Sequence, residues 1–183
     1  HQSGIKILVT GTRGIPGIPG GIETHCEELY PRIAGIGCSV TVMRRTPYVR
    51  DNYKIYRGVF LQNLFSPRST YFEAFVHTLF SIIYAKWNGY THIHIHGIGP
   101  SLLVPLARIF GLRVIMTNHG PDYKRQKWSK GSRFILRLGE LVGTIFAHKV
   151  IAVSLYIKKR LMYMYHRLDC VYIPNGVKIQ KKV

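Results

Sequence analysis

The sequence predicts an α/β fold with a single doubly wound, mostly parallel sheet of the Rossmann-like kind. Short apolar segments alternate with segments of helical length along most of the chain, and this alternation is typical of a parallel sheet that has helices on both faces. The short segments are almost continuously apolar, as expected of strands that are covered on both sides. The chain has 183 residues, of which 46% are hydrophobic, so it can build one such domain with its own core.

Each element follows from its local pattern. Residues 5-IKILVT-10 form an apolar run that ends in glycines, which indicates a buried strand. The run 38–44 is rich in β-branched residues, and residues 71–87 have the length and composition of a helix. Residues 46–69 are expected to be irregular apart from one strand. The predicted strands are 5–10, 38–44, 59–64, 91–96, 112–117, 149–153 and 170–174. The predicted helices are 21–36, 71–87, 101–110, 132–147 and 155–166.

The candidate site follows from the fold, because ligands of doubly wound sheets bind beyond the carboxyl ends of the strands. This rule selects the loops after Thr10, His96, Thr117 and Val153. The first of these loops is rich in glycine. Glycines let the backbone come close to a ligand, and the start of the helix that follows offers free N–H groups to an anion.

The charge balance indicates an anionic partner. Lys and Arg number 26 against 8 Asp and Glu, which gives a net charge of +18. Such a surface attracts nucleic acid, anionic lipid head groups or phosphorylated substrates. The cysteines Cys26, Cys38 and Cys170 have no metal-type spacing, and they suggest reduced thiols and a cytoplasmic location. No apolar run reaches the ~18 to 20 residues that a spanning helix needs.

One interpretation of the glycine loop is an NADP-dependent reductase of the short-chain type. Gly11, Gly14 and Gly17 fit GxxGxxG after a strand, and Arg44 and Arg45 end the second strand, where a 2′-phosphate could sit.

A Tyr123-x-x-x-Lys127 pair would imitate the catalytic couple of that class of enzyme. Two observations weigh against it. Pro16 and Pro19 delay the helix beyond the third glycine, and Tyr123 and Lys127 lie in a segment that is predicted to be a loop.

A second interpretation comes from the whole loop. Residues 11-GTRGIPGIPGGIET-24 closely resemble the GTRGIP–three residues–GGxET opening of bacterial family-four glycosyltransferases, a group with rhamnosyl- and glucosyltransferases that build surface polysaccharides. Residues 94-HIHG-97 and 117-TNHGPDYKRQKW-128 are similar to further segments of that family. So are 150-VIAVS-154 and 173-IPNGV-177, which resemble the end of its N-terminal domain.

The resemblance implies the N-terminal half of a two-domain GT-B enzyme. Residues 5–177 would form the acceptor-side domain and residues 178–183 the start of an interdomain linker, with the donor-binding C-terminal domain absent from this chain. The implied substrates are a nucleotide-sugar donor and a lipid-linked or oligosaccharide acceptor at the cytoplasmic face of the membrane. The resemblance also implies retention of anomeric configuration, with no metal ion and no cofactor. The isolated domain is expected to be inactive.

The resemblance also assigns roles on the donor side. Gly20 and Gly21 would approach the donor diphosphate, and Arg13 could add a cation there or be an ordinary solvated arginine. A backbone amide pair at a helix start stabilises negative charge on a departing group. His119 would contact the donor sugar near the reacting carbon; the alternative is a histidine that caps or satisfies the core.

Four more residues are candidates on the acceptor side. Asp122 would orient the acceptor hydroxyl or a neighbouring Lys124 or Arg125, or it is a turn aspartate. Glu23 would either cap the helix dipole or shape the acceptor pocket.

Three histidines alternate along residues 91-THIHIHGIGP-100, so their side chains share one face of a strand. A metal site would need further ligands, and the adjacent imidazoles would crowd one another. Position along the strand separates the three. His92 at the start is expected to be structural, His94 to be buried and hydrogen-bonded, and His96 at the carboxyl end to reach the cleft as a candidate acceptor residue.

The basic surface has two further interpretations. Basic residues gather at 124–133 and 158–160, which favours peripheral binding to an anionic membrane. The helix 71–87 could also lie in a membrane interface, although its apolar face is more simply explained by packing on the sheet. Non-specific nucleic-acid binding is the alternative, but the sequence has no zinc-finger, RNA-recognition or homeodomain signature.

Overall fold

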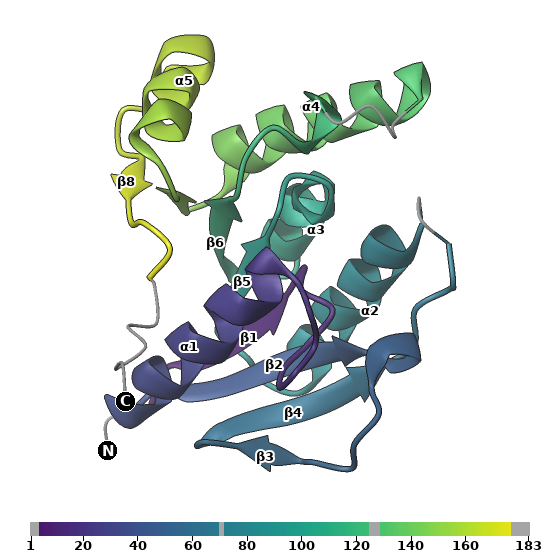
Figure 1. Ribbon diagram of the computed structural model, residues 1–183. Coiled ribbons are helices and arrows are strands. Elements are labelled where there is room, and N and C mark those ends of the chain that lie inside the picture. Colours follow the sequence, from purple (N-terminus) through teal and green to yellow (C-terminus); the bar gives the residue numbers. More distant parts are fainter. Residues whose placement is uncertain (1–3, 70–71, 125–128, 177–183) are drawn as a thin grey trace, which may run out of the picture.

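The computed structural model describes residues 4–69, 72–124 and 129–176. Eight strands form one sheet in the order β3-β4-β2-β1-β5-β6-β7-β8. All neighbouring strands run parallel except β3, which is antiparallel to β4 at one edge. Figure 1 shows this sheet with helices around it. The predicted fold class, a Rossmann-like and mostly parallel α/β sheet, is confirmed.

The strands are β1 (Lys6–Thr10), β2 (Ser39–Arg45), β3 (Ile55–Tyr56), β4 (Val59–Leu64), β5 (His92–His96), β6 (Arg113–Asn118), β7 (Lys149–Ala152) and β8 (Val171–Tyr172). The helices are α1 (Gly21–Gly35), α2 (Glu73–Trp87), α3 (Val104–Ile109), α4 (Lys130–Phe146) and α5 (Leu155–Tyr165). Three short 3-10 helices are η1 (Thr46–Tyr48), η2 (Pro100–Leu103) and η3 (Asp122–Lys124). Among the described helices, none is long and apolar enough to cross a bilayer.

The two faces of the sheet carry different helices. On one face α1 covers β1 and β2 through a cluster of Ile7, Val9, Val40 and Val42 with Cys26 and Tyr30. The other face carries the larger cluster, which joins strand residues to α2, α3 and α5 and includes Leu8, Met43, Ile93, Ile95, Val114, Met116, Ile82, Ala107 and Leu161. Side chains alternate between the faces because successive strand residues point in opposite directions. Figure 1 shows α1 on one side of β1 and β2 and α2 on the other.

Two predicted elements differ from the structure. Residues 46–69 contain a strand that the sequence did not indicate, because β3 pairs with β4 through a tight turn at Arg57 and Gly58, both with positive φ. A two-residue strand leaves almost no periodic pattern to detect. The predicted helix 101–110 is divided into η2 and α3, because Pro105 lacks the N–H that would continue a single helix through it.

Candidate active site

The loop between β1 and α1 is held by Glu23, on the first turn of α1. Its Oε1 accepts hydrogen bonds from the Arg13 backbone N–H at 2.8 Å and from Thr12 Oγ1 at 3.2 Å. A Cβ at Gly20 would lie 1.9 Å from its Oε2, and the φ of 149 at Gly20 is one that residues with a side chain rarely adopt, so this position favours glycine. Glu23 is 6% exposed. Its carboxylate therefore fixes the loop through Oε1, and its predicted contact with the acceptor stays a prediction.

The start of α1 lies at the carboxyl edge of the sheet. Gly20 is the N-cap and Gly21 the first helical residue, and both are exposed. The N–H groups at this end carry the positive end of the helix dipole. Arg13 donates from Nη1 to the Pro19 carbonyl at 3.2 Å and lies 5.3 Å from the ring centre of Tyr48. Its guanidinium is thereby held beside the start of the helix.

A chain of hydrogen bonds links β6 to the loop that follows it. His94 shares one hydrogen bond with Thr117 Oγ1 at 2.7 Å and another with Tyr30 Oη at 2.9 Å. The same Tyr30 hydroxyl lies 2.5 Å from His96 Nε2. His96 Nδ1 in turn lies 2.9 Å from His119 Nε2. We call Thr117, His94, Tyr30, His96 and His119 the histidine chain.

His96 is fully buried, so the prediction that its side chain reaches the cleft is wrong. Tyr30 and His119 occupy both of its ring nitrogens. His96 can therefore act on a ligand only through His119. The expectation of a buried, hydrogen-bonded His94 is confirmed, and His92 at the strand start bonds to the neighbouring Thr91.

His119 is half-buried at the carboxyl edge. Burial, together with the nearby His25 imidazole 5.5 Å away between ring centres, lowers the pKa of His119 to about 4. Burial likewise lowers the pKa of His94 to about 3 and that of His96 well below its usual value. These imidazoles are neutral near pH 7. Among the described residues, His119 Nδ1 has no hydrogen-bond partner, so the edge presents a neutral ring nitrogen.

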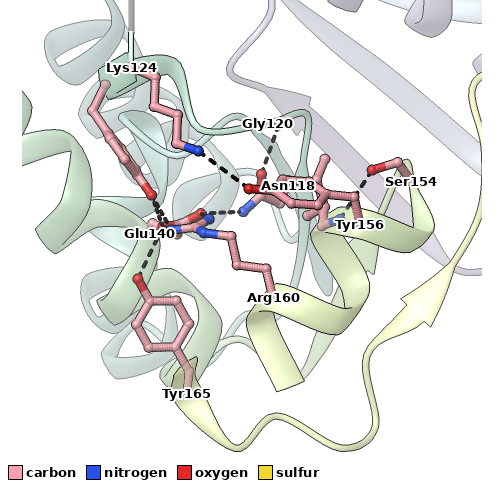
Figure 2. Close-up of polar contacts among 10 residues, drawn as sticks. Asn118, Gly120, Lys124, Glu140, Ser154, Tyr156, Arg160 and Tyr165 are labelled. Atoms are coloured by element: carbon pink, nitrogen blue, oxygen red, sulfur yellow. Dashed lines mark hydrogen bonds and ion pairs between the residues drawn. The ribbon is translucent and has the colours of Figure 1, made fainter. Parts of the chain in front are cut away.

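A second buried network holds the same loop from the other side. Asn118 donates from Nδ2 to Glu140 Oε1 at 3.0 Å and accepts from the Gly120 N–H at 2.8 Å. Glu140 of α4 is fully buried and pairs with Arg160 of α5 through both oxygens, at 2.6 and 2.8 Å. Tyr165 adds a hydrogen bond at 3.0 Å. Figure 2 shows these side chains converging on Glu140, and the network ties the residues on both sides of His119 to α4 and α5.

Glu140 is charged despite its burial. Desolvation pushes the pKa of Glu140 up, but hydrogen bonds from Arg160 and Asn118 outweigh it and the pKa lies below its ordinary value. The hydrogen bonds that Arg160 donates to Glu140 raise the pKa of Arg160. The loop after β6 is thus held from one side by the buried ion pair of Glu140 and Arg160, and from the other side by the neutral imidazoles of the histidine chain.

The chain belongs to Glycosyltransferase Family 4. The model of that family matches residues 19–181, which include α1, the histidine chain and the Glu140 network. No curated protein matches the chain by sequence.

Solved structures share the fold. The sucrose-phosphate synthase of Thermosynechococcus elongatus superimposes with a TM-score of 0.75 at 20% identity, over 94% of this chain and 48% of the synthase. A glycosyltransferase from Rickettsia africae ESF-5 superimposes with a TM-score of 0.60 at 18% identity, over 96% of this chain and 44% of that protein. At these identities the match shows the fold alone, a Rossmann-like half of a GT-B structure. The chain spans less than half the length of either protein.

In this family-four domain the remaining candidates lie around η3. Asp122 is half-buried, and its N–H bonds to the Gly120 carbonyl. Lys124 is exposed and donates to Tyr156 Oη of α5 at 3.3 Å, so it points toward α5 (Figure 2). Arg125 lies outside the described residues.

Two adjoining hollows open beyond β2 and β4, with volumes of about 350 and 630 Å³. Arg50 and Pro47 line both hollows, Arg13 lines the smaller and Arg68 the larger. Within the described residues, Arg50 and Arg68 have no hydrogen-bond or ion-pair partner. The hollows therefore offer unpaired cations next to the glycine loop, a feature that no sequence pattern marked.

The two arginines that suggested the 2′-phosphate site of a reductase are held by other side chains of the domain. Arg44 is 1% exposed and binds Asn63 and Asp51, and Arg45 pairs with Glu73 at 2.8 Å. Neither is open to a 2′-phosphate.

Tyr123 is buried with its hydroxyl on Glu140. Lys127 lies outside the described residues. The described part of the chain holds no group of three or more His, Cys, Asp or Glu side chains placed to bind a metal ion.

Proposed function

We propose that this domain is the acceptor-side half of a glycosyltransferase that moves a sugar from a nucleotide-sugar donor to a saccharide acceptor. The observation that carries the proposal is the position of His119. Its neutral ring is held at the carboxyl edge by the histidine chain, and His25 of α1 lies 5.5 Å from it. One edge therefore combines a fixed imidazole with the positive end of a helix.

The chemistry requires stabilisation of the departing nucleoside diphosphate. Negative charge on the diphosphate grows as the bond between the sugar and the phosphate oxygen breaks, and preorganised dipoles stabilise it. The N–H groups at Gly20 and Gly21, with the Arg13 guanidinium beside them, are the groups assigned to that charge. His119 contacts the donor sugar, and Asp122 orients the acceptor hydroxyl.

The acceptor is proposed to be a lipid-linked saccharide used in surface polysaccharide synthesis. The cation-lined hollows beyond β2 and β4 are large enough for sugar units and lie beside Arg13. Their free arginines suit the diphosphate of a lipid carrier, because guanidinium groups bind phosphate in a bidentate manner. We propose a cytoplasmic enzyme bound peripherally to the inner face of the membrane.

The donor-binding half is proposed to follow residues 5–177, with residues 178–183 as the start of the linker. The proposal is supported by the short span of this chain against its structural relatives, 48% and 44% of their lengths. Residues 1–183 alone are therefore expected to bind a nucleotide diphosphate weakly and to show no transfer.

The test joins this domain to the remainder of its polypeptide and measures transfer from a panel of radiolabelled nucleotide sugars to lipid-linked saccharides. His119→Ala is expected to lower kcat/KM by roughly a hundredfold or more. His166→Asn is the control, because His166 is an exposed residue at the end of α5. Transfer that survives His119→Ala undiminished would remove His119 from the reaction, and binding of NADPH in place of nucleotide sugars would overturn the proposal.

A further inference from the structure

The outer side of α4 is apolar although it faces solvent. Phe134 is 67% exposed and Ile135 52% exposed. Leu138, Ile145 and Phe146 on the same helix are also exposed. These five residues recur at spacings of three, four and seven, so they lie on one side of the helix. We call them the outer face of α4.

The inner side of α4 is fixed, so the helix cannot rotate to bury its outer face. A Cβ at Gly139 would lie 2.2 Å from the Ile98 carbonyl oxygen, which shows how closely the helix backbone approaches the segment just before η2. Gly143 makes a similar approach to Ser101. Glu140 between them is locked to Arg160. Exposure of the outer face is therefore built into the packing of the domain.

Basic residues border the outer face. Lys130, Arg133 and Arg137 follow one another at spacings of three and four and form a stripe along α4. The single acidic residue of α4 is Glu140, which is buried and paired, and α5 has no acidic residue and adds Lys158 and Lys159. An apolar helix face beside a strip of cations is the pattern of helices that lie in a membrane interface.

We propose that the outer face of α4 docks on an anionic lipid surface, with its aromatic and aliphatic side chains at the acyl boundary and its basic stripe on the head groups. The inference deepens the proposed function and rests on it for the lipid-linked acceptor. The charge of the chain favours anionic lipid over a second copy of the protein as the partner of this face. Two copies of net charge +18 would bring like charges together, whereas anionic lipid carries the complementary charge.

The need for basic residues beside the apolar face excludes α2. α2 exposes Phe72 at its start and Trp87 at its end. Its charged residues are the acidic Glu73 and the single basic Lys86. It therefore lacks the cation stripe that anionic lipid requires.

The position of α4 suits the reaction. α4 begins at the carboxyl edge of the sheet, where β6 leads through His119 and η3 into it, and Figure 1 shows its first turn on the side where β1 and β2 end. Docking through α4 would therefore bring the candidate site to the lipid surface that carries the acceptor.

The test measures co-sedimentation of the 183-residue chain with vesicles of phosphatidylcholine alone or mixed with phosphatidylglycerol. We expect binding to the mixed vesicles only, with release at about 0.5 M salt. Phe134→Ser with Ile135→Ser should weaken that binding at least about tenfold. Trp87→Ser, a change at an equally exposed aromatic residue of α2, should leave it unchanged.

Three outcomes would overturn the proposal. The first is equal binding to both vesicle types, and the second is a loss of vesicle binding in Trp87→Ser as large as in the double variant. The third is a double variant that loses self-association in sedimentation velocity but keeps its vesicle binding. Phe134→Trp, made in a chain with Trp87 and Trp128 replaced by phenylalanine, guards against misfolding, because it keeps the apolar face and its fluorescence should shift to the blue on mixed vesicles. An unshifted spectrum would place the helix outside the lipid.

The failure of this inference is separable from failure of the proposed function. Binding of uridine diphosphate to the domain joined to the remainder of its polypeptide is followed by the amide signals of Gly20 and Gly21, on α1. Vesicle binding without any response to the nucleotide would support the docking face and refute the nucleotide-sugar site. A response to the nucleotide with no vesicle binding would support the nucleotide-sugar site and refute the docking face.

Discussion

Acid is expected to destabilise this domain, because full or partial burial keeps four imidazoles in the neutral form. They are His77, His94, His96 and His119. Burial lowers the pKa of His77 and His94 to about 3 and that of His119 to about 4. Burial also lowers the pKa of His96 well below its usual value. In the unfolded chain the same groups take up a proton at about pH 6.5.

The sign and size follow from proton linkage. Between about pH 6.5 and about pH 4 the unfolded chain binds more protons than the folded one, so stability is fully present above pH 6.5 and is lost as the pH falls. Each imidazole contributes about 1.4 kcal/mol per pH unit. Four of them lower the free energy of unfolding by about 5 kcal/mol between about pH 6 and about pH 5. A domain of ordinary stability, about 5–15 kcal/mol, would lose about a third or more of its free energy of unfolding over that pH unit.

The assay is urea unfolding followed by circular dichroism at a series of pH values. His77→Asn should lower the slope of stability against pH by about a quarter, because the variant has one fewer imidazole that takes up a proton only on unfolding. His166→Asn is the matched control, since His166 is exposed and its left-handed backbone accommodates asparagine. Stability that stays flat from about pH 7 to about pH 5 would refute the burial argument, as would equal slopes in the two variants.

Two further substitutions test the framework of the site. Arg160→Met leaves the buried Glu140 carboxylate without its cation and should cost about 3–5 kcal/mol in urea unfolding, and a loss below about 1 kcal/mol would mean that the pair is dispensable. Gly11→Ala places a Cβ 2.1 Å from the His96 carbonyl oxygen at φ 91 and should lower the thermal midpoint far more than Gly17→Ala, where no atom lies within 4 Å. Similar midpoints for the two alanine variants would contradict this packing argument.

The sequence predicted which strand ends meet at the candidate site because strand polarity is a long-range constraint. Once residues 91–96 and 112–117 are identified as parallel strands, their carboxyl ends must lie side by side. His96 and His119 follow from that placement and lie 2.9 Å apart between ring nitrogens. The helix at residues 21–36 was also placed correctly to within a residue, because Pro16 and Pro19 delay its start.

What the sequence could not supply was the partner of each polar side chain. His96 appeared open because it ends a strand, but Tyr30 of α1 closes over it from 66 positions away. Glu140 lies within the predicted helix 132–147 and was not a candidate residue, yet it is the centre of a buried network with Arg160. Such contacts depend on how helices pack on the sheet, and no local periodicity encodes them.

The histidine chain has a consequence for the proton at the candidate site. Tyr30 has one hydroxyl proton for two imidazoles, so it donates to one and accepts from the other. With all rings neutral, His94, His96 and His119 must then carry their protons on the same ring nitrogen, all on Nδ1 or all on Nε2. The exposed Nδ1 of His119 is accordingly a donor or an acceptor according to the direction of the whole chain. The buried framework, rather than solvent, therefore sets what His119 can offer a sugar hydroxyl.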